Sequence, residues 1–176
     1  MSTLRDEFVS AGGVQTADEL DRVCLLFAQK QGFERFRLAV EMPAESLVCS
    51  PYLQFDSWVT CETHNFPTLL LRALGECTIF DPVVLRLRKS PLPCLWSRAF
   101  YENAGALERW EIKAAHGLTE GLAVASPSAS GVVVILDLAR RGGEDSMAVT
   151  TQCVAAASLF VAIVAAAAHS ILAKPA

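Results

Sequence analysis

Two polar residues in an apolar stretch, Asp81 and Trp96, are the best candidates in the sequence for contact with a small molecule. Asp81 lies between apolar segments of the stretch 65–96, and Trp96 closes that stretch after two prolines. A carboxylate that accepts hydrogen bonds and an indole N–H that donates one are the sparse polar contacts that orient a ligand in an apolar pocket. A structural role is equally open, because Asp81 before Pro82 is a favourable helix N-cap and Trp96 can fill a core.

Few other residues could do chemistry. Cys77 and Cys94 flank the proposed site within this stretch, and a cysteine paired with one of the three histidines could in principle cleave an acyl or lactone bond. The sequence has no nucleophile elbow and no glycine-rich phosphate loop. Cys61 and His64 have a spacing that could ligate a metal, but a second pair of ligands is missing. We predict no enzyme, no metal and no cofactor, with an acyl or lactone hydrolase as the remote alternative.

Composition narrows the class of protein. The chain has 176 residues, of which 52% are hydrophobic, so a single domain, 1–176, can bury a sizeable core. The net charge of −4 and the scattered basic residues do not favour nucleic-acid binding. We expect Arg86, Arg88 and Arg140 on the solvated surface. Six cysteines without a C-x-x-C motif, and no signal peptide at the start, predict reduced thiols in a cytoplasmic protein.

Hydrophobic periodicity predicts the elements that must position Asp81 and Trp96. A capping box, Thr16 with Glu19, opens a helix over 17–31. The spacing of apolar residues then predicts strands over 33–42 and 57–62, helices over 68–74, 82–88 and 105–116, a hairpin of strands over 121–125 and 132–138, and a helix over 146–174. On the helix over 105–116, Lys113 falls mostly on the polar side. This order predicts an α+β fold, an α/β/α sandwich around a central antiparallel sheet.

The last helix has two interpretations. Between Val149 and Leu172 the sequence has no charged residue apart from a charge on His169, a length that could span a bilayer. Its centre is alanine rather than leucine, and aromatic belts are missing. We therefore expect a buried helix at a dimer interface and no membrane span.

Several short motifs, in order, carry a resemblance to a known family. They are Asn65-Phe66-Pro67, Asp81-Pro82-Val83, Leu92-Pro93-Cys94-Leu95-Trp96, Ala115-His116-Gly117-Leu118 and Gly121-Leu122. Together they resemble the autoinducer-binding domain of LuxR-type quorum-sensing regulators over nearly the whole of 20–174. The resemblance implies an α/β/α sandwich that holds an acyl-homoserine lactone between sheet and helices. It also implies that Asp81 accepts the ligand's amide N–H and that Trp96 packs near the lactone.

The sequence departs from the family at the residues that hold the ligand's carbonyl groups and lactone. Phe66 replaces the family's tyrosine, and Leu70 and Leu74 replace a tryptophan and a tyrosine when the count starts at Asn65. Counted back from Asp81, the two positions are Thr68 and Arg72, so neither register restores the aromatic pair. Each missing hydrogen-bond partner costs roughly 1–3 kcal/mol. We therefore predict an acyl-homoserine lactone or a less polar, lipophilic relative as the ligand. The predicted ligand-binding residues are Asp81, Trp96, Phe66, Leu70, Leu74 and Val134.

The resemblance leaves two roles open. Family regulators continue into a helix-turn-helix domain, and this sequence stops about where that linker would begin, so we expect no direct DNA binding. The chain is then the sensor domain of a regulator. Alternatively, it is a ligand-independent partner that pairs with full-length relatives and blocks them, since dimeric regulators need two DNA-binding arms. The resemblance implies a homodimer or a heterodimer with related regulators.

Overall fold

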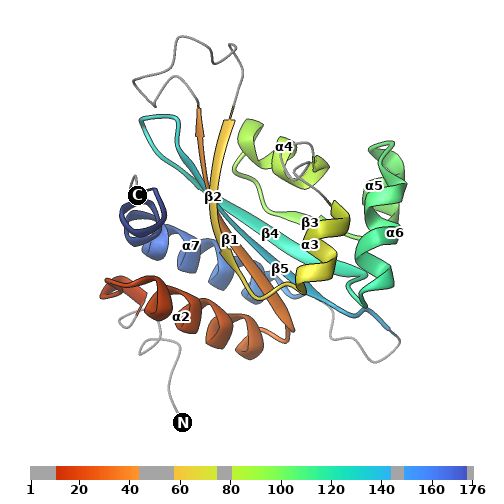
Figure 1. Cartoon of the computed structure of the whole chain (residues 1–176), viewed down its shortest axis with the longest axis horizontal. Coiled ribbons are helices and arrows are strands. Elements are labelled where there is room, and N and C mark those ends of the chain that lie inside the picture. Colours follow the sequence, from red (N-terminus) through yellow and green to blue (C-terminus); the bar gives the residue numbers. More distant parts are fainter. Residues whose placement is uncertain (1–10, 44–57, 75–80, 144–148, 174–176) are drawn as a thin grey trace.

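A five-stranded antiparallel sheet forms the centre of the fold in the computed structural model, which describes residues 11–43, 58–74, 81–143 and 149–173 (Figure 1). The strand order is β2-β1-β5-β4-β3. The strands are β1 (Arg35–Pro43), β2 (Trp58–His64), β3 (Cys94–Trp96), β4 (Glu120–Pro127) and β5 (Val133–Arg140). The predicted α+β sandwich and the hairpin of β4 and β5 are confirmed.

Two long helices, α2 (Ala17–Lys30) and α7 (Thr151–Leu172), cover one face of the sheet (Figure 1). The predicted capping box starts α2: Glu19 N donates to the Thr16 side chain, and Thr16 N donates to the Glu19 carboxylate. The helix α7 begins after Thr150, whose side chain accepts from Cys153 N. The predicted starting residues 146–148 of this helix lie outside the described ranges.

The side chains between these helices and the sheet form an apolar cluster, the long-helix core. Phe27 of α2 and Phe160 of α7 stack with their ring centroids 4.1 Å apart. The sheet contributes alternate residues of its central strands, including Leu38 and Leu136, which are fully buried. Burial of this apolar surface, at about 25 cal/mol per Å², ties α2 and α7 to the sheet.

Four shorter helices cover the opposite face (Figure 1). They are α3 (Thr68–Leu74), α4 (Pro82–Lys89), α5 (Arg98–Asn103) and α6 (Leu107–Ala115). Their apolar residues pack with the facing strand residues into a second cluster, the short-helix core, made of Phe66, Leu70, Leu74, Val83, Val84, Leu87, Cys94, Trp96, Tyr101, Leu118, Ala123, Val133, Ile135 and Ala139. Of these helices, α5 is missing from the sequence prediction. Its six residues lack a side-chain cap, and burial of Tyr101 rather than local propensity holds it in place.

The helix α7 is long and apolar enough to cross a membrane by length and composition alone. In this fold one of its faces, which includes Phe160 and Val164, is buried against the sheet. The face that points away from the sheet carries Ala155, Leu159 and Ala162, and it has no Asp, Glu, Lys or Arg.

Candidate ligand-binding site

The candidate site lies in the short-helix core, on the face of the sheet that carries its polar residues. Strand register aligns one row of residues across all five strands: His64, Arg37, Asp137, Ala123 and Cys94. Above this row a small cavity of about 20 Å³ is lined by charged and apolar side chains, among them Asp81, Lys113 and Asp137. Because a water molecule needs roughly 10–15 Å³, this cavity has room for about one water.

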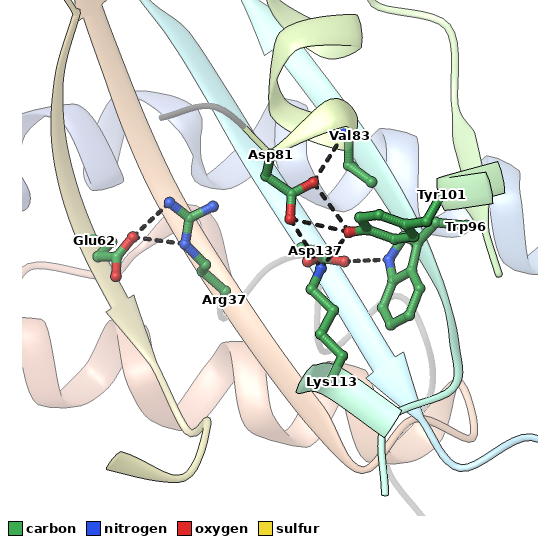
Figure 2. A network of polar contacts seen from close by, with 8 residues as sticks. All are labelled: Arg37, Glu62, Asp81, Val83, Trp96, Tyr101, Lys113 and Asp137. Atoms are coloured by element: carbon green, nitrogen blue, oxygen red, sulfur yellow. Dashed lines mark hydrogen bonds and ion pairs between the residues drawn. The ribbon is translucent and has the colours of Figure 1, made fainter. Parts of the chain in front are cut away.

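Asp81 occupies the centre of the site and also starts a helix. As predicted, it is the N-cap of α4, and its Oδ1 accepts from Val83 N at 2.9 Å. Tyr101 Oη donates to the same carboxylate, 3.0 Å from each oxygen, and Lys113 Nζ lies 3.2 Å from Oδ2 (Figure 2). Asp81 is only 6% exposed. Its buried carboxylate therefore depends on the Val83 N–H, the Tyr101 hydroxyl and the Lys113 ammonium for its polar contacts.

Lys113 reaches into the site from α6. Its Nζ donates to Tyr101 Oη at 2.6 Å and lies 4.5 Å from the centre of the Trp96 ring, close enough for a cation–π interaction. The side chain is 3% exposed, although the sequence pattern predicted that it would lie on the polar side of this helix. That expectation was wrong. The Asp81 carboxylate and the Trp96 ring offset the free-energy cost of burying the Lys113 ammonium.

Burial and the neighbouring charges shift the pKa values of Asp81 and Tyr101. Burial alone would raise the pKa of Asp81, but the Lys113 ammonium and the hydrogen bonds from Val83 and Tyr101 outweigh it and lower that pKa. Burial and the nearby Asp81 carboxylate raise the pKa of Tyr101 well above its ordinary value, so its hydroxyl stays protonated and can donate. The cluster therefore holds an ionised acid, a neutral phenol and an ammonium.

Trp96 is fixed by a second buried acid. Its Nε1 donates to Asp137 Oδ1 at 2.7 Å, and burial raises the pKa of Asp137 despite the opposing effect of Lys113. The indole lies directly over Gly121 on the neighbouring strand, where an added Cβ would collide with the ring and with the Leu138 carbonyl oxygen. Only glycine leaves room for the tryptophan at this point.

Further along the sheet, ion pairs continue the polar surface. Arg37 Nη2 lies 2.6 Å from Glu62 Oε2, and Arg88 of α4 pairs with the buried Glu41 of β1. Arg88 and Arg140 were both expected on the solvated surface. The structure corrects this, because the Arg88 side chain is 6% exposed. Arg140 is also buried, on the opposite face of the sheet over the Phe33 ring, with its Nε 2.8 Å from Glu120 Oε1.

Five of the six predicted ligand-binding residues lie together. Asp81 and Trp96 belong to the polar cluster, and Phe66, Leu70 and Leu74 pack into the short-helix core beside it. The sixth, Val134, faces the opposite side of the sheet and packs into the long-helix core. Because strand residues alternate between faces, its neighbours Val133 and Ile135 are the ones that face the site.

Tyr101, Lys113 and Asp137 lie in the candidate site but were not among the predicted site residues. Two of them left a signal. Asp137 is a lone acid in a β-branched run and shares its strand face with Ile135, while Lys113 follows Trp110 by three residues and so falls on the same side of the helix. Tyr101 left none, because it lies in the helix that the sequence did not predict.

Chemistry other than binding has little support in this part of the chain. Within the described ranges, no three His, Cys, Asp or Glu residues gather as a metal site requires. Cys94 is buried at 1% exposure, and burial raises its pKa to about 11, which keeps the thiol protonated and unreactive. Cys77 lies outside the described residues.

A known protein family matches the part of the sequence that contains the candidate site. The model of the autoinducer-binding domain family matches residues 77–169, more than half of the chain, and its span includes Asp81, Trp96, Lys113 and Asp137. The chain belongs to this family. Autoinducer-binding domains are the signal-binding part of LuxR-type quorum-sensing regulators, so the resemblance in the sequence is confirmed and the family role is to sense a signal molecule and regulate transcription.

Solved structures share the fold of this autoinducer-binding domain. Escherichia coli SdiA matches with a TM-score of 0.79 at 18% identity, covering 98% of this chain and 70% of that one. SdiA in complex with octanoyl-rac-glycerol matches with a TM-score of 0.76 at 19% identity, covering 97% and 68%. The N-acylhomoserine lactone dependent LuxR family factor CepR2 from Burkholderia cenocepacia matches with a TM-score of 0.70 at 18% identity, covering 98% and 96%. No curated protein matches the sequence of this chain.

Proposed function

We propose that the chain is a sensor domain that binds a small amphipathic molecule between the sheet and the helices α3 to α6. The observation that carries this proposal is the buried polar cluster of Asp81, Tyr101 and Lys113 inside an otherwise apolar core. Sparse polar groups in an apolar surrounding are typical of a site that orients a lipophilic ligand. The head group would lie at Asp81 and Trp96, and the acyl chain would lie along Phe66, Leu70 and Leu74.

The ligand class follows from the groups that this site offers. The leucines of α3 provide no hydroxyl or N–H for a ligand's carbonyl groups, whereas Asp81 is an acceptor for an N–H or O–H group. We therefore propose an N-acyl amide of the acyl-homoserine lactone type, or a less polar acylated relative. SdiA, with octanoyl-rac-glycerol bound, gives an example of an amide-free acyl ligand in this fold.

Two octanoyl probes test this proposal. Isothermal titration calorimetry with N-octanoyl-homoserine lactone should give saturable binding that Asp81→Asn weakens roughly tenfold, because a charge-assisted hydrogen bond becomes a neutral one. Affinity for 1-octanoyl-rac-glycerol should change less, since a hydroxyl group can donate to or accept from asparagine. Asp18→Asn, in the exposed first turn of α2, is the matched control. Absence of saturable binding of either probe to the folded wild-type protein would overturn the proposal.

A second proposed property is pairing of two copies of this chain through α7. The outward face of this helix carries Ala155, Leu159, Ala162 and Ala166 and no Asp, Glu, Lys or Arg, and Leu159 is 51% exposed. Small residues let two helices approach closely, and a twofold axis would place the same face against itself. Light scattering after size exclusion should show a dimer that Leu159→Glu disrupts. Leu92→Glu, at a 64% exposed leucine before β3, should leave the dimer intact. A wild-type monomer at high concentration would refute pairing.

The free cysteines support a proposal about the cellular compartment of the protein. Cys24, Cys61, Cys94 and Cys153 are free thiols, and three of them are buried. Free thiols persist in a reducing compartment, so we propose that the protein is cytoplasmic. Labelling with a thiol reagent in intact cells and in lysates would test this, because a cytoplasmic protein reacts with a membrane-impermeant reagent only after lysis.

A further inference from the structure

We propose that Lys113 is a built-in occupant of the ligand site, so that a molecule whose N–H group would bind Asp81 must first displace the lysine ammonium. This inference rests on the proposed function and adds a residue that sets the affinity and selectivity of the site.

The hydrogen bonds to Asp81 all come from the chain itself. Val83 N and Tyr101 Oη donate to it, and Lys113 Nζ lies 3.2 Å from Oδ2. The first two donors have structural roles, since Val83 N belongs to the first turn of α4 and Tyr101 anchors α5. Of the two side-chain donors, Lys113 lines the cavity beside Asp81 and Tyr101 does not, so the ammonium occupies the position that we assign to a ligand's N–H.

The ammonium is held in this position from several sides (Figure 2). Its Nζ donates to Tyr101 Oη at 2.6 Å, and the rings of Trp96 and Tyr101 lie 4.5 and 5.0 Å from it. Asp137, which accepts from Trp96 Nε1, adds a second acid to the same cluster. The hydrogen bonds, aromatic rings and acids that would bind a ligand's head group bind the lysine ammonium instead.

The volume of the cavity agrees with an occupied site. The space beside Lys113 and Asp81 is about 20 Å³, whereas sites for ligands of drug size measure roughly 300–1,000 Å³. An acyl ligand therefore requires side chains to move. Lys113 is suited to moving, because an ammonium on a flexible four-carbon stem can swing toward solvent, whereas the backbone N–H of Val83 cannot.

The occupant has a measurable consequence for affinity. If the ammonium lies on Asp81 in about nine molecules of ten, the apparent affinity for a competing donor falls about tenfold. The same contact lets the domain fold around a compensated Asp81 before any ligand arrives, because a buried carboxylate with a paired charge is tolerated.

Lys113→Met tests the inference, since methionine keeps the length of the side chain and removes the ammonium. We expect N-octanoyl-homoserine lactone to bind this variant roughly tenfold tighter than the wild type. Methyl octanoate, which has an acyl chain of the same length and no hydrogen-bond donor, reports the effect of extra space alone and should gain much less. Lys89→Met, at an exposed lysine that ends α4, is the matched control and should bind both probes as the wild type does.

The outcomes separate this inference from the proposed function. Equal affinity of wild type and Lys113→Met for the lactone overturns the built-in occupant and leaves the sensor function standing. Equal gains for both probes also overturn it, because Lys113 would then only fill space. Absence of binding in both proteins overturns both proposals. If Lys113→Met does not fold, the double variant Lys113→Met/Asp137→Asn is used, which removes one of the two buried acids and keeps Asp81. Its affinities for the two probes are then compared with those of Asp137→Asn.

Discussion

The two faces of the central sheet carry different kinds of side chain. Against α2 and α7 the strands present mainly aliphatic side chains, and the long-helix core has Phe27 stacked on Phe160 at its centre. Against the short helices the same strands present Arg37, Glu41 and Asp137, which ion pairs and hydrogen bonds satisfy. Because strand residues alternate between faces, one sheet can have an apolar face that packs against helices and a polar face that can contact a ligand.

The difference teaches where stability and specificity come from in this domain. The long-helix core is shielded by helices of 14 and 22 residues, whereas the helices over the site have between 6 and 9. A buried ion pair contributes little net stability but is costly to break. The apolar face should therefore set the free energy of unfolding, and the polar face should set what the domain binds.

Truncation of the stacked pair in the long-helix core should have the largest effect on stability. Phe160→Ala removes a ring that is 1% exposed, and such a change costs about 3–5 kcal/mol. Chemical denaturation measures the loss, and Leu159→Ala, on the exposed face of the same helix, is the control. Affinity for the octanoyl probes should stay within about twofold where the variant is folded. A large loss of affinity in folded protein would show that the two faces are not separate in function.

A methyl group added beneath Trp96 should have an intermediate effect, and on the site itself. Gly121→Ala places a Cβ against the indole and against the Leu138 carbonyl, and overpacking of this kind costs about 1–3 kcal/mol. The indole N–H resonance of Trp96 should move away from its hydrogen-bonded position in proton–nitrogen NMR spectra. Gly143→Ala, where no atom lies within 4 Å of the added carbon, should change neither stability nor the spectrum. An unmoved Trp96 resonance in Gly121→Ala would contradict the packing argument.

Removal of the second buried acid should have the smallest effect and a dependence on pH. Burial holds the pKa of Asp137 above its ordinary value, so its contribution to stability is present at low pH and is lost as pH rises through the raised pKa. The side-chain amide introduced by Asp137→Asn keeps an acceptor for Trp96 Nε1 but does not titrate. Unfolding free energies measured between about pH 4 and pH 7 should therefore shift in favour of the variant as pH rises.

The depressed pKa of Asp81 acts in the opposite sense in both proteins. Its contribution to stability is present above its ordinary pKa and is lost as pH falls through the lowered one. Between about pH 4 and pH 7, above the ordinary pKa of Asp81, this contribution is present in both proteins and adds little to the change of their difference with pH. A difference that falls with rising pH would contradict the raised pKa of Asp137.

The sequence allowed the fold to be predicted well because its signals are local. The capping box at Thr16 and the Asp81-Pro82 step each place a helix start where the structure has it. Asp81 is the helix cap and also lies in the candidate site, so the two interpretations of this acid do not exclude each other. Hydrophobic periodicity supplied the order of the remaining elements apart from α5 and β3.

The site was harder to predict, because its partners meet only in three dimensions. Lys113 lies on an amphipathic helix in a sequence context typical of a solvated lysine, and only the approach of α6 to Asp81 and Trp96 buries it. Val134, a predicted ligand-binding residue, lies on the opposite face of the sheet from Asp81, since a shift of one residue along a strand reverses the face.

The double role of Asp81 gives this domain a reporter of its own state. The carboxylate that meets the Lys113 ammonium also holds the Val83 amide proton at the start of α4. Any exchange of partners at Asp81 is therefore felt by a backbone proton one peptide beyond Pro82. The chemical shift and the solvent exchange of that single amide can follow, in the intact chain, which group the acid holds.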